Sequence, residues 1–188
     1  ALHVDSELGP DLLILDGGAC DLGIESTIID CTRGAPVLLR PGSIRRTQVE
    51  QACGRKLLSK EELLEQETRG LEAPKASGTL ESHYAPNATV RLMDAKALQT
   101  ALKMLDGAID SVARPSIAVY ARTLLKNVPR NIVLRNMPQY AAPTAHELFS
   151  VLRELDATGV KLIWVETPPD TQDWEGVRDR LQRASAPT

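Results

Sequence analysis

The second half of the chain alternates between short apolar runs and segments whose apolar positions repeat every 3.6 residues. The apolar runs, which predict buried strands, occupy residues 90–93, 116–120, 131–134 and 160–165. The periodic segments predict amphipathic helices, which we expect to begin at Asp94, at a capping box of Thr144 with Glu147, and at Asp173. Strands that alternate with helices are typical of a parallel sheet covered on both faces. The fold class is therefore α/β, with a small Rossmann-like domain at the C-terminus.

The first half carries three more apolar runs, each followed by residues that interrupt a strand. Residues 12–16 precede a Gly-Gly pair, residues 24–31 form a β-branched run, and residues 37–40 precede a Pro-Gly pair. Thr47 with Glu50 fits a capping box, and the apolar positions that follow have helical spacing. We therefore expect three strands and then an amphipathic helix.

The sequence changes character between its two halves. Residues 60–67 are charged and compatible with a helix, whereas residues 69–82 contain Gly, Pro and Ser without periodicity. This pattern divides the chain into a first part (1–58), a linker (59–87) and the C-terminal domain (88–188). The chain begins with Ala instead of Met and enters strand-like sequence almost at once. We therefore expect it to be a piece of a longer protein.

Composition and charge argue against several classes of function. The 22 Lys and Arg residues and 25 Asp and Glu residues give a net charge of −3, which does not favour nucleic-acid binding through bulk charge. The 2 Trp, 3 Tyr and 1 Phe are too few for a surface that stacks single-stranded bases. We find no apolar run of membrane-spanning length and no signal peptide, so no membrane association is expected. The 3 cysteines form no C-x-x-C pair and are typical of reduced, mostly buried thiols, which predicts a cytoplasmic protein.

The common catalytic motifs are missing from the sequence. It contains no G-x-x-x-x-G-K-[ST], G-x-G-x-x-G, H-E-x-x-H or G-x-S-x-G. The 3 histidines are too scattered to form a metal site, and the cysteines do not complete one. We therefore assign no metal ligands.

Two short polar stretches could carry chemistry. Ser26 and Thr27, with Glu25 before them, interrupt an apolar strand, and buried hydroxyls need partners. Pairing across the sheet is the alternative to a ligand site there. Arg40 ends the next strand, and a guanidinium at the carboxyl end of a strand suits a phosphate or carboxylate. A surface arginine in a turn is the alternative for Arg40.

A third stretch, His83 and Tyr84, lies at the end of the expected linker. Pro86 favours an extended conformation for the residue before it, so the segment would lie flat across a surface. The alternative is a hinge whose tyrosine packs against the domain that it enters.

Together these stretches resemble the long, two-domain form of the threonylcarbamoyl-AMP synthases. The segments that carry the resemblance are 16–18 (D-G-G), 23–30 (G-I-E-S-T-I-I-D), 39–44 (L-R-P-G-S-I), 77–86 (ending in H-Y-A-P), 155–160 and 179–184. They span nearly the whole chain in the family's order. The resemblance implies the last part of a YrdC-like α/β domain, then a linker and the Rossmann-like domain.

The resemblance also implies an activity and roles for the candidate residues. The family makes threonylcarbamoyl-AMP from L-threonine, bicarbonate and ATP, with release of pyrophosphate, for the threonylcarbamoyladenosine (t6A) modification of tRNA. It implies that Ser26 contacts threonine with Thr27 beside it, and that Arg40 contacts ATP phosphate. It further implies that Tyr84, with His83, closes the nucleotide site from the linker. A Mg²⁺ on the phosphates would share the neutralisation of charge with Arg40.

The sequence departs from the family at its start. The Lys-x-Arg and Ser-x-Asn motifs that bind ATP and threonine in the family are not in this chain. The full-length protein would therefore be the nucleotidyltransferase, whereas this portion alone is expected to be inactive. Alternative functions are a catalytically inactive module that binds a nucleotide or a partner, and a regulatory lid domain. Enzymes of the tRNA pathway are candidate partners, and direct contact with tRNA is left open.

Overall fold

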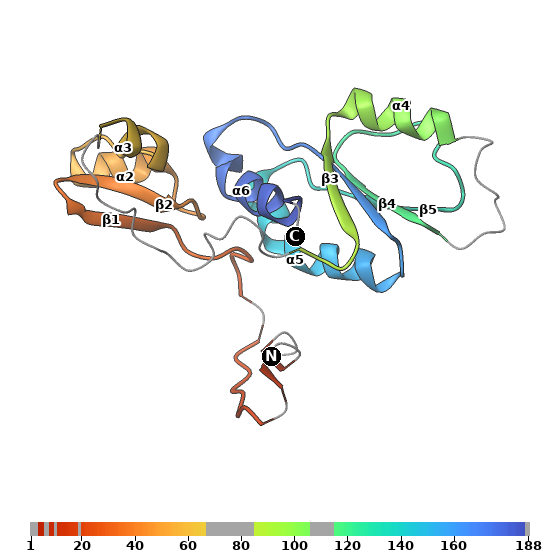
Figure 1. Cartoon of the computed structure of the whole chain (residues 1–188), viewed down its shortest axis with the longest axis horizontal. Coiled ribbons are helices and arrows are strands. Elements are labelled where there is room, and N and C mark those ends of the chain that lie inside the picture. The colour runs from red at the N-terminus through yellow and green to blue at the C-terminus, as the bar shows by residue number, and fades with distance from the viewer. Residues whose placement is uncertain are drawn as a thin grey trace.

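The computed structural model describes residues 4–5, 8–9, 11–18, 20–66, 85–105 and 115–186 of the chain. It divides into a hairpin unit, residues 28–66, and the C-terminal domain, residues 85–186 (Figure 1). The elements of the hairpin unit are β1 (Ile28–Arg33), β2 (Ala35–Arg40), α2 (Arg46–Cys53) and α3 (Lys60–Gln66). Those of the C-terminal domain are β3 (Thr89–Met93), α4 (Ala95–Leu105), β4 (Ile117–Ala121), β5 (Ile132–Asn136), α5 (Ala141–Ala157), β6 (Leu162–Glu166), the 3-10 helix η1 (Gln172–Trp174) and α6 (Glu175–Ala184).

The C-terminal domain is built on a four-stranded parallel sheet in the order β3-β6-β4-β5. Its apolar core lies on both faces of this sheet. Residues of α5 and α6 pack with alternate residues of the strands on one face, and Leu98 and Leu102 of α4 pack with Val119 and Trp164 on the other. Figure 1 shows α4 and α5 on opposite sides of the strands. The predicted parallel sheet with both faces covered is confirmed.

The predicted helix starts are right in one case and displaced in the others. Asp94 caps α4 as expected, since its Oδ1 accepts a hydrogen bond of 2.7 Å from the backbone N–H of Ala97. By contrast, α5 begins three residues before Thr144. The Thr144 hydroxyl bonds back to the carbonyl of Tyr140 at 3.0 Å, within the first turn.

Glu147, the second residue of that predicted capping box, binds a buried tyrosine instead. It accepts a hydrogen bond of 2.8 Å from the Tyr120 hydroxyl, and burial together with this bond raises the pKa of Tyr120 above its ordinary value. Asp173 lies in η1, so the helix predicted to begin there is a 3-10 turn followed by α6. The apolar stripe predicted for this helix is confirmed, because Trp174, Val177 and Leu181 are all buried.

The hairpin unit is an antiparallel pair, β1 and β2, with α3 packed against β2. The amphipathic helix predicted after Thr47 forms as α2, but none of its residues is buried. The strand predicted at 37–40 is confirmed within β2, but only the part from Ile28 onward of the predicted strand 24–31 forms β1. The capping box predicted at Thr47 is wrong, because α2 begins at Arg46 and the backbone N–H of Arg45 donates to Gln48 Oε1. The helix compatible with residues 60–67 is present as α3.

The strand predicted at residues 12–16 does not form. No strand of the described residues pairs with this segment, and Leu13 and Leu15 are 86% and 89% exposed. An apolar run that finds no neighbouring strand has no partners for its backbone hydrogen bonds. The expectation of mostly buried cysteines is also wrong, since all three are exposed and free. Within the described part of the chain, no helix has both the length and the apolarity needed to cross a bilayer.

Asp156 ties the end of α5 to the start of β3. Its carboxylate accepts hydrogen bonds from the backbone N–H groups of Asn87 and Ala88, and from the Asn87 side-chain amide, at 2.8–3.2 Å. We expect Asp156→Ala to lower the free energy of unfolding by about 1–2 kcal/mol, because it leaves backbone donors without this acceptor. Urea unfolding tests this, with Asp170→Ala as the control: Asp170 is 98% exposed and forms an ion pair with Arg178. An equal effect of the two substitutions would contradict the role of Asp156.

Candidate functional site

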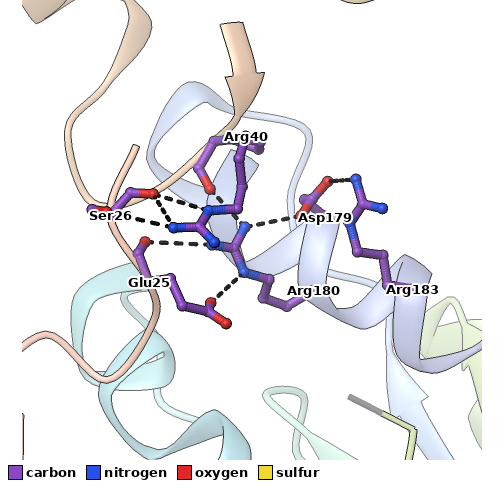
Figure 2. A network of polar contacts seen from close by, with 7 residues as sticks. Glu25, Ser26, Arg40, Asp179, Arg180 and Arg183 are labelled. Atoms are coloured by element: carbon purple, nitrogen blue, oxygen red, sulfur yellow. Dashed lines mark hydrogen bonds and ion pairs between the residues drawn. The ribbon is translucent and has the colours of Figure 1, made fainter. Parts of the chain in front are cut away.

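Ser26 and Arg40, taken from two different sequence motifs, lie in contact (Figure 2). Arg40 ends β2 and is only 6% exposed. Its Nε and Nη2 both donate to the Ser26 carbonyl, at 3.1 and 3.0 Å, and Nη2 lies 3.4 Å from the Ser26 hydroxyl. The alternative of a surface arginine in a turn is therefore wrong. The structure brings the hydroxyl and the guanidinium to one place.

The backbone around this pair is held at close range by the R-P-G turn. A Cβ atom placed on Gly42 would lie 2.4 Å from the backbone nitrogen of Thr27 and 2.7 Å from the carbonyl oxygen of Glu25. Only glycine permits that approach. The Thr27 hydroxyl, in turn, donates to the carbonyl of Ile44 at 3.0 Å. Residues 24–27 thus pack on the turn instead of continuing β1.

Arg180 is a second guanidinium at this place, and no role was predicted for it from the sequence. It lies on α6, is fully buried, and extends from the C-terminal domain toward the Glu25–Ser26 segment (Figure 2). Its Nε donates to Glu25 Oε2 at 2.9 Å, and its Nη1 donates to the carbonyl of Pro41 at 2.6 Å. The signal was present in the sequence: residue 180 follows Val177 by three positions, so it falls on the apolar face of α6.

Two carboxylates balance the positive charge. Glu25 pairs with Arg180, and Asp179 pairs with both Arg180 and Arg183, at 2.8–2.9 Å. Burial, and next the nearby Arg183 guanidinium, lower the pKa of Lys60 at the start of α3. The hairpin unit and α6 therefore share one charged network.

His83 and Tyr84, the remaining predicted site residues, lie outside the described residues, as does most of the expected linker. Whether they approach Ser26 and Arg40 stays a prediction. Among the described residues, no group of three or more His, Cys, Asp or Glu side chains could hold a metal ion.

A cavity of about 320 Å³ is lined in part by Gly42 of the R-P-G turn. It is bounded by the segments 21–24 and 42–45, by the start of α5, and by η1. Because α5 and η1 follow β5 and β6, the cavity lies at the carboxyl edge of the parallel sheet, the edge at which α/β proteins bind ligands. Its walls mix Trp174 and Tyr140 with an ion pair of Arg45 and Asp173. Ser26 and Arg40 are not among its lining residues, so the predicted pair does not face it.

Comparison with known proteins places this α/β chain in a family. The model of the threonylcarbamoyl-AMP synthase C-terminal domain (Sua5_C) matches residues 44–186. The chain therefore belongs to the threonylcarbamoyl-AMP synthase family, as the resemblance of its motifs implied.

Individual relatives agree with this assignment. Threonylcarbamoyl-AMP synthases of Schizosaccharomyces pombe, Pyrococcus abyssi and Bacillus subtilis are 28%, 29% and 29% identical to it over 99%, 92% and 98% of the chain. The chain covers 48%, 48% and 52% of these proteins, so it spans about half the length of the curated relatives that it matches. The crystal structure of P. abyssi Sua5 complexed with L-threonine superposes with a TM-score of 0.69 and 26% identity, over 90% of this chain and 48% of that one.

Proposed function

We propose that this chain is the C-terminal portion of a two-domain enzyme that makes threonylcarbamoyl-AMP for the t6A modification of tRNA. In this proposal residues 1–58 complete a YrdC-like catalytic domain, residues 59–87 are the linker, and residues 88–188 are the C-terminal domain. The full-length protein is the nucleotidyltransferase and acts in the cytoplasm, on L-threonine, bicarbonate and ATP. The portion described here does not catalyse the reaction alone.

The observation that carries the proposal is the contact between Arg40 and Ser26. The two residues come from the R-P-G and G-I-E-S-T motifs, fourteen positions apart, and the Arg40 guanidinium lies 3.0–3.4 Å from two oxygens of Ser26. A crystal structure of a relative is complexed with L-threonine, which supports a threonine site in this family. We assign the threonine contact to Ser26 and Thr27, and the ATP phosphate contact to Arg40.

The chemistry needs positioning and charge neutralisation more than a covalent nucleophile. A carbamate oxygen of N-carboxythreonine attacks the α-phosphorus of ATP, the new O–P bond forms, and the bond to the β-phosphate breaks so that pyrophosphate leaves. A fixed guanidinium stabilises the charge that spreads over the phosphate oxygens. His83 and Tyr84 would cover the nucleotide from the linker and exclude water from the labile product.

In this proposal Mg²⁺ would bind together with ATP. The described residues offer no cluster of metal ligands, so an ion at this site would be held mainly by the phosphates, as is usual for Mg²⁺.

The proposal is tested by an assay on the full-length protein of which this chain is a part. With threonine, bicarbonate and ATP we expect pyrophosphate and threonylcarbamoyl-AMP in equal amounts, and no product when threonine is omitted. This chain alone, in the same assay and in calorimetry against ATP and threonine, is the control and is expected to give neither product nor binding. A full-length protein that binds ATP but forms no threonylcarbamoyl-AMP would favour the alternative of an inactive binding module or lid.

A further inference from the structure

Arg180 connects the C-terminal domain to the candidate site through all three nitrogens of its guanidinium. Nε donates to Glu25 Oε2 at 2.9 Å, Nη1 donates to the carbonyl of Pro41 at 2.6 Å, and Nη2 donates to the carbonyl of Glu25 at 3.3 Å. Asp179 accepts a further bond from Nη1 at 2.9 Å. A planar guanidinium bonded in this way has one orientation available to it.

The carbonyls that Arg180 binds flank the Ser26–Arg40 pair. Glu25 directly precedes Ser26, and Pro41 directly follows Arg40. Since Arg40 itself binds the Ser26 carbonyl, one arginine of the C-terminal domain holds the backbone on both sides of that pair (Figure 2).

Close packing couples α6 to the same backbone. A Cβ atom placed on Gly176, in the first turn of α6, would lie 2.8 Å from Ile24 Cδ1 and 3.1 Å from the carbonyl oxygen of Gly42. The helix thus lies directly on the R-P-G turn, without a side chain between them. A displacement of α6 would be passed on to the turn and to residues 24–27.

The chemistry of the contact favours a geometric role over a purely stabilising one. Burying a guanidinium is costly even when it is paired, and an apolar side chain of similar size often gives equal or greater stability. Here the charge is retained on the apolar face of α6, beside Val177 and Leu181, and is balanced by Glu25 and Asp179. An apolar residue could not donate oriented hydrogen bonds to two separate carbonyls.

We propose that Arg180 is a positioning residue for Ser26 and Arg40: from the C-terminal domain it sets the distance between the serine that contacts threonine and the arginine that contacts phosphate. This inference rests on the proposed function, because Arg180 acts through those two residues and does not touch the substrate. It gives the C-terminal domain a definite part in building the site of the other domain.

The test compares Arg180→Lys with Arg178→Lys in the full-length protein. Arg178 is a matched control, because it lies on the same helix and also donates to two backbone carbonyls, those of Pro169 and Thr171, within its own domain. A lysine keeps the charge but has no planar fork to bind two carbonyls at once. We expect Arg180→Lys to raise the threonine Kd in calorimetry about tenfold or more, since small misplacements of binding groups have effects of that order. Hydrogen exchange of the amides at 24–28 should also become faster.

A structural effect alone would give a different result. It would lower the melting temperature of both variants while leaving the threonine Kd and the exchange at 24–28 equal in the two, and that outcome overturns the inference. If Arg180→Lys does not fold, Glu25→Ala removes the partner of Nε from the other side, and unchanged exchange and threonine affinity in that variant likewise overturn it.

Failure of the proposed function would give a third pattern of experimental results. A wild-type full-length protein that forms no threonylcarbamoyl-AMP rejects the enzyme assignment, and exchange at 24–28 then decides on its own whether Arg180 holds this segment. An active wild type whose Arg180→Lys variant has the same kcat and the same KM for threonine keeps the enzyme and rejects only the positioning role.

Discussion

Arg40→Ala in the full-length protein is expected to lower kcat/KM for ATP by about 100-fold or more, the effect typical of removing one donor from a charge-stabilising site. The proposed phosphate contact is lost with the guanidinium. So are the two hydrogen bonds to the Ser26 carbonyl, which place the serine beside it. Arg40→Lys should recover little of the activity, because a lysine ammonium cannot reproduce a fork that binds two oxygens.

The measurement must separate activity from stability, because Arg40 is buried. Loss of its hydrogen bonds should lower the free energy of unfolding by about 2 kcal/mol. Initial rates are therefore compared at a temperature where circular dichroism shows the variant to be folded. Arg55→Ala is the control: Arg55 lies in the same unit, is exposed, and donates to the carbonyl of Gly34, away from Ser26. Wild-type kcat/KM in a folded Arg40→Ala variant would remove Arg40 from the site.

The sheet of the C-terminal domain could be predicted from sequence because each of its strands is apolar and finds neighbours within the chain. The run at residues 117–121 is buried throughout and lies between two other strands of the sheet. The run at residues 12–16 is just as apolar, yet it is exposed and unpaired in the described structure. Periodicity measures how well a segment suits a sheet, but pairing depends on partners that a local pattern does not reveal.

Helix starts were harder to predict, because a hydroxyl or carboxylate has several competing uses. Asp94 caps its helix, whereas Thr144 bonds to a carbonyl of the preceding turn and Glu147 binds a buried tyrosine hydroxyl. Asp94 and Thr144 are both residue types that favour a helix start, and Glu147 stands where a capping box has its carboxylate. Tertiary contacts, which decide among these uses, are not present in a window of four residues.

Only part of the candidate site could be predicted from the sequence, because tertiary contacts also decide which distant residues reach it. Ser26 and Arg40 stood out as polar residues next to apolar strands, and the structure brings them together. Arg180 belongs to a helix more than 130 positions away, and its only local signal is a charge on an apolar face. Such a residue needs a counter-charge. Here Asp179 and the half-buried Glu25 supply it, and no spacing rule could have indicated the pairing with Glu25.

Gly42→Ala is expected to disrupt the R-P-G turn and the segment that packs on it. The added Cβ would lie 2.4–2.7 Å from backbone atoms of Glu25, Ser26 and Thr27, none of which can rotate away as a flexible side chain would. Either the turn or the 25–27 segment must shift. We expect the free energy of unfolding to fall by about 3 kcal/mol, at the upper end of the usual range for overpacking.

Gly17→Ala provides the matched control for this substitution, because both glycines have ordinary backbone angles but nothing lies within 4 Å of a Cβ at Gly17. There the added methyl should change stability by less than about 1 kcal/mol, and in the favourable direction if it only restricts the unfolded chain. Urea unfolding of the two variants thus isolates the close approach from the general effect of replacing glycine by alanine. In the full-length protein, Gly42→Ala should also weaken threonine binding, because the shift moves Ser26 relative to Arg40. Equal stability of the two variants would mean that the R-P-G turn does not pack on residues 25–27 as described, and the contact that carries the functional proposal would lose its support.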